Sequence, residues 1–121
     1  IIPSKNSVSV NADAIKTSAG ALHTIPVCRE DNLTKSIKYL KNCGIHIAGA
    51  TEKGNRSYTK GTYDGPVCLI MGAEDRGIPQ EHLALCDEWV KIPILGHIGS
   101  LNVSVAAGVL IYEIVKQRNE E

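Results

Sequence analysis

The chain has 121 residues, enough for one folded domain with its own hydrophobic core. Lys and Arg together number 13, as do Asp and Glu, so the formal net charge at pH 7 is zero. This balance argues against a polybasic nucleic-acid-binding tail or an acidic tail, but it allows a basic patch on one face. A hydrophobic fraction of 43% and a charged fraction of 21% are typical of globular proteins and exclude wholesale disorder.

The first part of the chain predicts two helices and two short strands. Residues 8–22 are rich in alanine at helical spacing, and residues 25–28 form a short β-type run. Asn32 suits the N-cap of the next helix and Gly44 suits its end, with apolar side chains at helical spacing between them: Leu33, Ile37 and Leu40. Residues 45–48 then predict a strand.

The second part continues the alternation of strands and helices. Residues 52–66 are polar and read as a loop with room for short structure, whereas residues 67–71 are five apolar residues in a row, typical of a strand buried on both faces. A short helix over 79–85, a strand over 89–92 and a helix over 102–118 follow. The last helix carries one apolar stripe: Val103, Ala106, Ala107, Leu110, Ile111 and Ile114. This alternation predicts an α/β fold with a mostly parallel sheet and helices on both faces.

The cysteines and the uncharged stretch near the C-terminus do not indicate a metal or a membrane. The four cysteines contain no Cys-x-x-Cys pair and the histidines do not cluster with them, so we expect no zinc site. Three cysteines lie in or beside apolar runs, which favours buried, reduced thiols in a cytoplasmic protein. Residues 92–112 carry no formal charge but include Pro93, His97 and several glycines, so we expect no membrane span.

Three glycine-rich segments leave predicted strands, at residues 48–51, 71–77 and 92–102. Ligands of open α/β sheets bind at the carboxyl ends of the strands, and glycine lets the backbone approach a ligand closely. Each glycine alone is more simply a tight turn, but three such loops at one sheet edge predict a cleft for a planar heterocycle. None of them matches a Gly-x-Gly-x-x-Gly or Walker loop, so neither a classical dinucleotide site nor a P-loop site is supported.

Two of these loops carry a family resemblance. Residues 72–78 and 92–106 resemble the second and third signature motifs of the SpoU (TrmH-type) RNA ribose methyltransferases of the SPOUT superfamily, and residues 18–21, 25–27 and 32–33 resemble its ribosomal-RNA branch. The resemblance implies a C-terminal trefoil knot, which chain physics alone would not predict. It also implies methylation of an RNA ribose 2′-hydroxyl with S-adenosylmethionine as cofactor, a homodimer, and no metal. The implied target is a guanosine of large-subunit ribosomal RNA, with transfer RNA as the alternative.

The resemblance also assigns site residues. It implies that Gly72, Ile92, Ile94 and Leu101 contact the cofactor, with Ala50 near the first loop. Glu74 resembles the carboxylate of the second motif, which orients the catalytic loop or a basic partner; a solvated acid, or a cap for the helix entered at Pro79, is an equal alternative.

Ser100 and Asn102 resemble the polar pair near the target ribose and, with Glu74, complete the implied catalytic set. Serine and asparagine before a helix are also favoured N-caps, and the two roles are compatible. The basic loop residues Lys53, Arg56 and Lys60 are predicted to be solvated surface, as are Asp75 and Arg76. RNA contact is the sharper alternative for the three loop residues and for Arg76.

The family's first motif is not found in this sequence, and this limits the activity that we expect of the chain alone. The family's first motif, with an Asn and an Arg that activate the hydroxyl, lies upstream of the segment matched here, and residues 1–4 resemble the end of the following strand. None of the arginines, at 29, 56, 76 and 118, takes that place. We therefore expect a C-terminal part of the methyltransferase domain, which alone binds cofactor weakly if at all and methylates nothing. A non-catalytic module for cofactor binding, RNA docking or dimerisation is the competing hypothesis.

Overall fold

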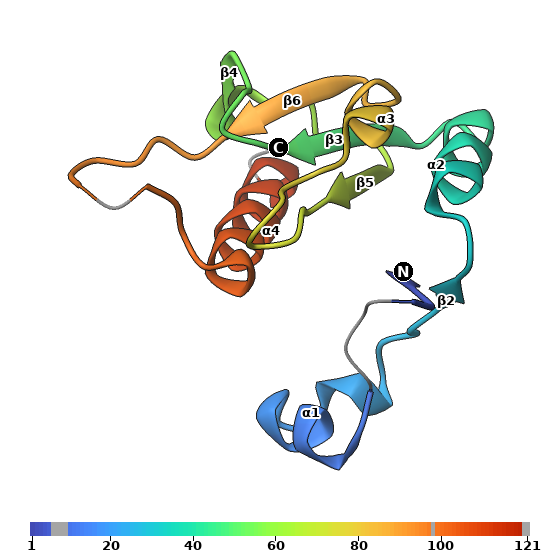
Figure 1. Ribbon diagram of the computed structural model, residues 1–121. Helices are drawn as coiled ribbons and strands as arrows, with labels where there is room; N and C mark the ends of the chain where they lie inside the picture. Colours follow the sequence, from blue (N-terminus) through green and yellow to red (C-terminus); the bar gives the residue numbers. More distant parts are fainter. Residues whose placement is uncertain (6–9, 98, 120–121) are drawn as a thin grey trace. The chain divides into compact units, whose positions relative to one another are not determined.

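A computed structural model describes residues 1–5, 10–97 and 99–119 of the chain (Figure 1). The chain forms two compact units, Ile1–Ser36 and Ile37–Glu121, named here the N-terminal and C-terminal units. The boundary between them falls inside helix α2 (Leu33–Asn42).

The N-terminal unit contains two short parallel strands and short helical segments. Strand β1 (Ile2–Pro3) pairs with β2 (Arg29–Glu30), with Ile2 opposite Arg29. Helix α1 (Ala12–Thr17) begins at Asn11, whose side-chain oxygen accepts a hydrogen bond of 2.9 Å from the Ala14 N–H, and the 3₁₀ helix η1 (Ala21–His23) follows.

Two predictions for this unit are corrected. The helix predicted over 8–22 is interrupted, because Ala19 and Gly20 have φ values of 54° and 84°, outside the right-handed helical region; residues 8 and 9 lie outside the described part. The predicted strand over 25–28 is irregular, and the strand lies instead at Arg29–Glu30. The position of β2 therefore follows from its pairing with β1 and not from the apolar run at residues 25–28.

The C-terminal unit is built on a four-stranded parallel sheet in the order β4-β6-β3-β5. Its strands are β3 (His46–Ala50), β4 (Arg56–Ser57), β5 (Val67–Ile70) and β6 (Glu88–Lys91). Every described pairing is parallel, and β3 is hydrogen-bonded on both sides, to β5 and β6. The expected α/β fold with a parallel sheet is confirmed.

The buried strand of this sheet is β3, and the prediction for residues 67–71 was wrong in this respect. Ile47 and Ala48 of β3 are 0% exposed and Gly49 is buried, whereas all four residues of β5 are only half-buried. Strand β5 ends the order of the described sheet, so it has a neighbouring strand on one side only. Apolar composition indicated a strand correctly but did not indicate its place in the sheet.

Helices lie on opposite faces of the sheet. Helix α3 (Gln80–Leu83) and the turn after it cover one face, where a Cβ on Gly49 would lie 2.8 Å from Cys86 Sγ and 3.7 Å from Leu83 Cδ2. On the same face, the Trp89 indole N–H donates to the Leu83 carbonyl at 2.9 Å. Side chains alternate along a strand, so Ala50 and Val90 point to the other face, where they line a pocket with Leu110 of α4 (Val103–Asn119).

The predicted caps of α2 are confirmed. The Asn32 side-chain oxygen accepts a hydrogen bond of 3.1 Å from the Lys35 N–H, and Gly44 ends the helix with φ 84°.

The apolar stripe predicted for α4 is only partly buried. Leu110 is buried, but Ile111 is 52% exposed and the charged Glu113 is buried instead. The last turns of α4 face the segment that contains β4 and the 3₁₀ helix η2 (Tyr58–Lys60), where Gln117 and Arg118 donate to the carbonyls of Thr59 and Tyr63 at 3.2 and 3.1 Å. Hydrogen bonds to backbone carbonyls of this segment therefore hold the C-terminal end of α4.

The four cysteines are free thiols with different surroundings. Cys68 and Cys86 are half-buried, and burial raises the pKa of Cys68 and raises that of Cys86 to about 11. Cys28 and Cys43 are exposed, so the expectation of burial fails for Cys28, although it follows an apolar run. Among the described residues, no helix is long and apolar enough to cross a membrane and no cluster of His, Cys, Asp or Glu could hold a metal.

Candidate functional site

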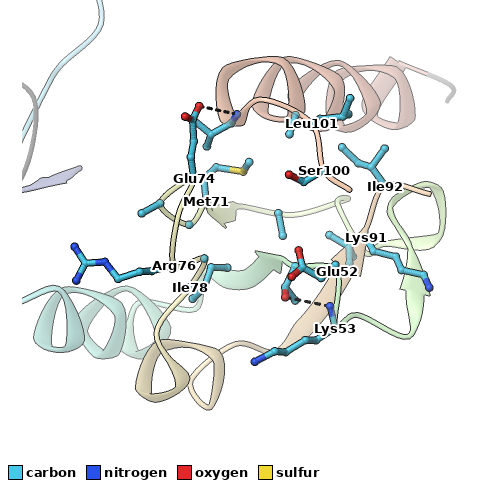
Figure 2. Close-up of a pocket in the computed structure, with 18 of the residues that line it drawn as sticks. Glu52, Lys53, Met71, Glu74, Arg76, Ile78, Lys91, Ile92, Ser100 and Leu101 are labelled. Carbon is cyan, nitrogen blue, oxygen red and sulfur yellow. Dashed lines mark hydrogen bonds between the residues drawn. The ribbon is translucent and has the colours of Figure 1, made fainter. Parts of the chain in front are cut away.

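A pocket of about 380 Å³ opens at the carboxyl ends of β3, β5 and β6 (Figure 2). All three predicted glycine-rich segments contribute to its lining, and the first turns of α4 complete it. The parallel order of the sheet explains this, because parallel strands bring their carboxyl ends to one edge. The volume lies in the range of small-molecule sites, which is about 300–1,000 Å³.

The loop after β5 is folded tightly against itself. A Cβ on Gly72 would lie 2.3 Å from the Gly77 carbonyl carbon and 2.5 Å from the Ile78 nitrogen, far inside contact distance. The Gly77 N–H donates to the Ala73 carbonyl at 2.8 Å and closes the loop. Only glycine fits at position 72, and the loop presents its backbone to the pocket as a result.

All four residues predicted to contact the cofactor line this pocket: Gly72, Ile92, Ile94 and Leu101. Ala50 lines it as well, at the end of β3. Ile92 and Ile94 are half-buried and Leu101 is 38% exposed, so they form an apolar surface that is still accessible from the pocket. An apolar surface combined with open backbone groups suits the recognition of a heterocycle.

Glu74 lines the pocket, whereas Asn102 is not among the lining residues and is joined to the site through Glu74. The Asn102 side-chain amide donates to Glu74 Oε1 at 3.0 Å, and the Val103 N–H lies 3.5 Å from the same oxygen. The Asn102 side-chain oxygen in turn accepts from the Ser104 N–H at 2.9 Å. Asn102 is therefore an N-cap of α4, as the alternative reading held, and Glu74 orients it.

The alternative that Glu74 caps the helix entered at Pro79 is wrong. The N-cap position of α3 is Pro79 and has no side-chain cap. The carboxylate sits instead at the N-terminus of α4, where a negative charge is favourable because of the helix dipole.

Ser100 also lines the pocket and lies between Met71 and Ile92 in Figure 2. Within the described part of the chain its hydroxyl makes no hydrogen bond, so it can donate to or accept from a ligand. Ser100 and Glu74 therefore give the pocket two polar side chains from two loops, and Asn102 supports Glu74 from behind them.

Several lining residues were not singled out from the sequence. Lys91 at the end of β6, Glu52 in the loop after β3, and the apolar Met71 and Ile78 all line the pocket. The sequence indicated these residues only by their position, because each lies at or after the end of a predicted strand, on the sheet edge where a site was expected.

The charged residues of the predicted surface loops differ in their partners. Arg56 donates to Glu88 Oε2 at 2.9 Å, so its charge is paired. Arg76 and Asp75 line the pocket mouth and are 3.7 Å apart, both largely exposed. Lys53 also lines the pocket, whereas Lys60 does not, and RNA contact by any of these residues stays a prediction.

A carboxylate network lies at the beginning of β6. Glu88, whose side chain is 7% exposed, binds His46 Nε2 at 2.9 Å and accepts from the Thr62 N–H at 2.8 Å. Burial raises the pKa of Glu88, but these hydrogen bonds and Arg56 outweigh it and hold the pKa below its usual value. The Ile47 N–H, with help from Lys41, likewise lowers the pKa of Asp87. These groups join β3, β4 and β6 and are structural.

Comparison with known proteins agrees with this geometry. The sequence profile of the SpoU rRNA Methylase family matches residues 1–112. A 23S rRNA (guanosine-2′-O-)-methyltransferase RlmB from a Burkholderia species is 39% identical over 118 residues, which is 98% of this chain and 48% of that protein. The chain thus spans about half the length of the curated relatives it matches.

Solved structures show the same fold. The SpoU methyltransferase AviRb from Streptomyces viridochromogenes, in complex with AdoMet, superposes with a TM-score of 0.89 at 25% identity and covers 99% of this chain and 50% of that one. The A. aeolicus TrmH/SpoU tRNA modifying enzyme gives a TM-score of 0.83 at 26% identity, over 98% of this chain and 60% of that one. With the family profile matched over most of its length and the motif loops gathered at one pocket, the chain belongs to the SpoU rRNA methylase family.

Proposed function

We propose that this chain forms the cofactor pocket and part of the catalytic site of an S-adenosylmethionine-dependent RNA ribose 2′-O-methyltransferase. The observation that carries the proposal is the pocket itself, lined by all three glycine-rich loops, with Ser100 and Glu74 in its lining and Asn102 bound to Glu74. The AviRb structure, which matches this fold, contains AdoMet.

The residues present suit this cofactor. The apolar side chains of Ile92, Ile94 and Leu101 and the backbone at Gly72 would hold its adenosine, because the cavity is both large enough and lined by groups that read a flat heterocycle. When bound, the cofactor supplies an electrophilic methyl group on a sulfonium sulfur.

The chain's own residues position the ribose rather than activate it. Transfer requires the 2′-oxygen to be aligned with the methyl carbon and to lose its proton. The free Ser100 hydroxyl would hydrogen-bond the ribose, while Asn102, fixed by Glu74, would set the position of the loop that carries both. The group that takes the proton is expected from the family's first motif, which is not matched in this chain.

We infer a guanosine of large-subunit ribosomal RNA as the target. The Burkholderia relative is a 23S rRNA guanosine methyltransferase, and the sequence match around residues 18–33 points to the same branch. The A. aeolicus structure, a tRNA modifying enzyme, keeps transfer RNA as the alternative. Fluorescence anisotropy with a large-subunit rRNA fragment and a tRNA transcript of equal length separates the two: tighter binding of the tRNA would overturn the assignment.

A homodimer, a C-terminal trefoil knot and a cytoplasmic location complete the proposal. The outward side of α4 supports the dimer, because Val105, Ile111 and Tyr112 are 53%, 52% and 77% exposed there. Light scattering over a concentration series tests the dimer, and a mass that stays monomeric at millimolar concentration would contradict it.

Calorimetric titration with S-adenosylhomocysteine tests the cofactor assignment. We expect a weak but saturable signal with one site per chain, in keeping with the weak cofactor binding expected of this segment alone. Absence of any signal at millimolar concentration would favour the competing hypothesis of a non-catalytic module for RNA docking or dimerisation.

A further inference from the structure

Two lysines at the pocket mouth have no partner for their charge. Lys53, in the loop after β3, and Lys91, the last residue of β6, both line the pocket and are exposed. Neither forms an ion pair or a side-chain hydrogen bond within the described part of the chain. Other cations nearby are paired: Arg56 with Glu88 at 2.9 Å and Lys41 with Asp87 at 3.3 Å.

The backbone holds the two lysines in fixed places. The Thr51 N–H donates to the Val90 carbonyl at 2.9 Å, which joins the segments directly before Lys53 and Lys91. The next turn packs even closer, because a Cβ on Gly54 would lie 3.0 Å from the Val90 carbonyl carbon. Gly54 is buried, so the loop that carries Lys53 is packed against β6. The backbones of Lys53 and Lys91 are therefore held in fixed positions relative to each other.

The position of the pair relative to the pocket indicates what it binds. Figure 2 shows Lys53 and Lys91 across the pocket from Glu74, with both side chains extending outward. Glu52 lies near them but forms no ion pair with either in the described part of the chain. A polyanion that crosses the mouth would therefore meet, on one side, two ammonium groups that form no ion pair in the described part of the chain and, on the other, the Ser100 hydroxyl.

We propose that Lys53 and Lys91 bind two backbone phosphates of the RNA strand on either side of the target nucleotide. This inference rests on the proposed function, because it takes the pocket mouth as the place where the ribose enters. Phosphate contacts fix the register of a nucleic acid without reading its bases, so the two lysines are positioning residues. Arg56, which the sequence grouped with Lys53, is paired with Glu88 and is not part of this proposal.

The salt dependence of RNA binding tests the proposal. Binding of a fluorescent single-stranded RNA oligonucleotide is followed by anisotropy at several salt concentrations for the chain, Lys53→Gln/Lys91→Gln and the control Lys35→Gln/Lys38→Gln. The control removes the same charge from exposed positions on α2. We expect the slope of log K against log salt to fall by about 1.4 for the pocket variant, about 0.7 per phosphate contact, and to be unchanged in the control.

S-adenosylhomocysteine titration of the same variants separates this inference from the proposed function. The dissociation constant for S-adenosylhomocysteine should be unchanged in the pocket variant. A weaker affinity for it with unchanged RNA binding would assign the lysines to the cofactor and overturn the proposal. Equal slope losses in both variants, or no salt-dependent RNA binding by the unmodified chain, would also overturn it. A chain that binds RNA through these lysines but no S-adenosylhomocysteine would refute the proposed function alone.

Discussion

Glu74 and Asn102 are 28 positions apart in the sequence, yet a hydrogen bond of 3.0 Å joins their side chains at the pocket mouth. This hydrogen bond connects the loop after β5 to the first turn of α4. The motif resemblance singled out both residues, but their contact depends on how two distant loops meet, which local sequence does not encode. The same holds for Glu88, whose partners come from three separate segments.

A double-mutant cycle measures this contact. We expect Asn102→Ala to lower the free energy of unfolding by about 1 kcal/mol, because it removes an N-cap, and Glu74→Gln by about 0.5 kcal/mol, because it removes a charge near the helix N-terminus. Urea unfolding of the double variant should show a loss smaller than the sum, since each change weakens the same charge-assisted contact. Asp75→Asn, at the neighbouring exposed acid, should have little effect. Strictly additive losses would mean that the two residues act independently.

Gly72 is the residue whose substitution should harm the pocket most. An alanine Cβ there would lie 2.3 Å from the Gly77 backbone, so the loop must move. We expect Gly72→Ala to lower the free energy of unfolding by about 1–3 kcal/mol, as for other overpacked sites. We also expect it to weaken S-adenosylhomocysteine binding about tenfold, equivalent to about 1.4 kcal/mol.

Gly65→Ala is the matched control for this substitution, because a Cβ at position 65 has nothing within 4 Å. Thermal unfolding and calorimetry should give values for Gly65→Ala near those of the unmodified chain. If Gly72→Ala behaves in the same way, the tight loop does not shape the pocket.

At the scale of elements, sequence patterns located most strands and helices but not their lengths or burial. The caps Asn32 and Gly44 gave the limits of α2 correctly, because capping is a local property. The helix over 8–22 was too long, because alanine spacing does not reveal that Ala19 takes a positive φ. Burial of β3 rather than β5 follows from strand order, which depends on long-range pairing.

The beginnings of β3 and β6 are joined by carboxylates, which makes the stability of the sheet dependent on pH. The pKa values of Asp87 and Glu88 are lowered from 3.8 and 4.5 in the folded state. Folding therefore gains stability from their ionised forms above those values, and the gain is lost as the pH falls through the lower folded pKa values. We expect the free energy of unfolding to be level near neutral pH and to decrease below about pH 4.5.

Urea unfolding at several pH values checks this expectation. Glu88→Gln should make the decrease shallower and lower the stability at neutral pH, because His46 and Arg56 lose their ionised partner. Asp64→Asn, at an exposed acid, should keep the full pH dependence. A decrease of equal steepness in both variants would show that Glu88 does not contribute to it.

At the scale of the whole molecule, the alternation of strands and helices predicted the α/β class, and one long motif predicted the family. The position of the pocket followed from the rule that parallel strands direct their loops to one edge. A trefoil knot, by contrast, has no signature in periodicity or composition and came only from the resemblance. The polar contacts of α4 with the segment after β4 were also beyond the pattern, since the sequence showed an apolar stripe.

The three glycine-rich loops of the pocket are proposed to bind the cofactor of an RNA methyltransferase together. Amide chemical-shift mapping during titration of the labelled chain with S-adenosylhomocysteine tests this proposal most directly and detects even weak binding. We expect shifts at Ala50, Gly72, Ile92, Ile94 and Leu101, which represent all three loops. Shifts confined to other residues, or no shifts at saturating concentration, would contradict it.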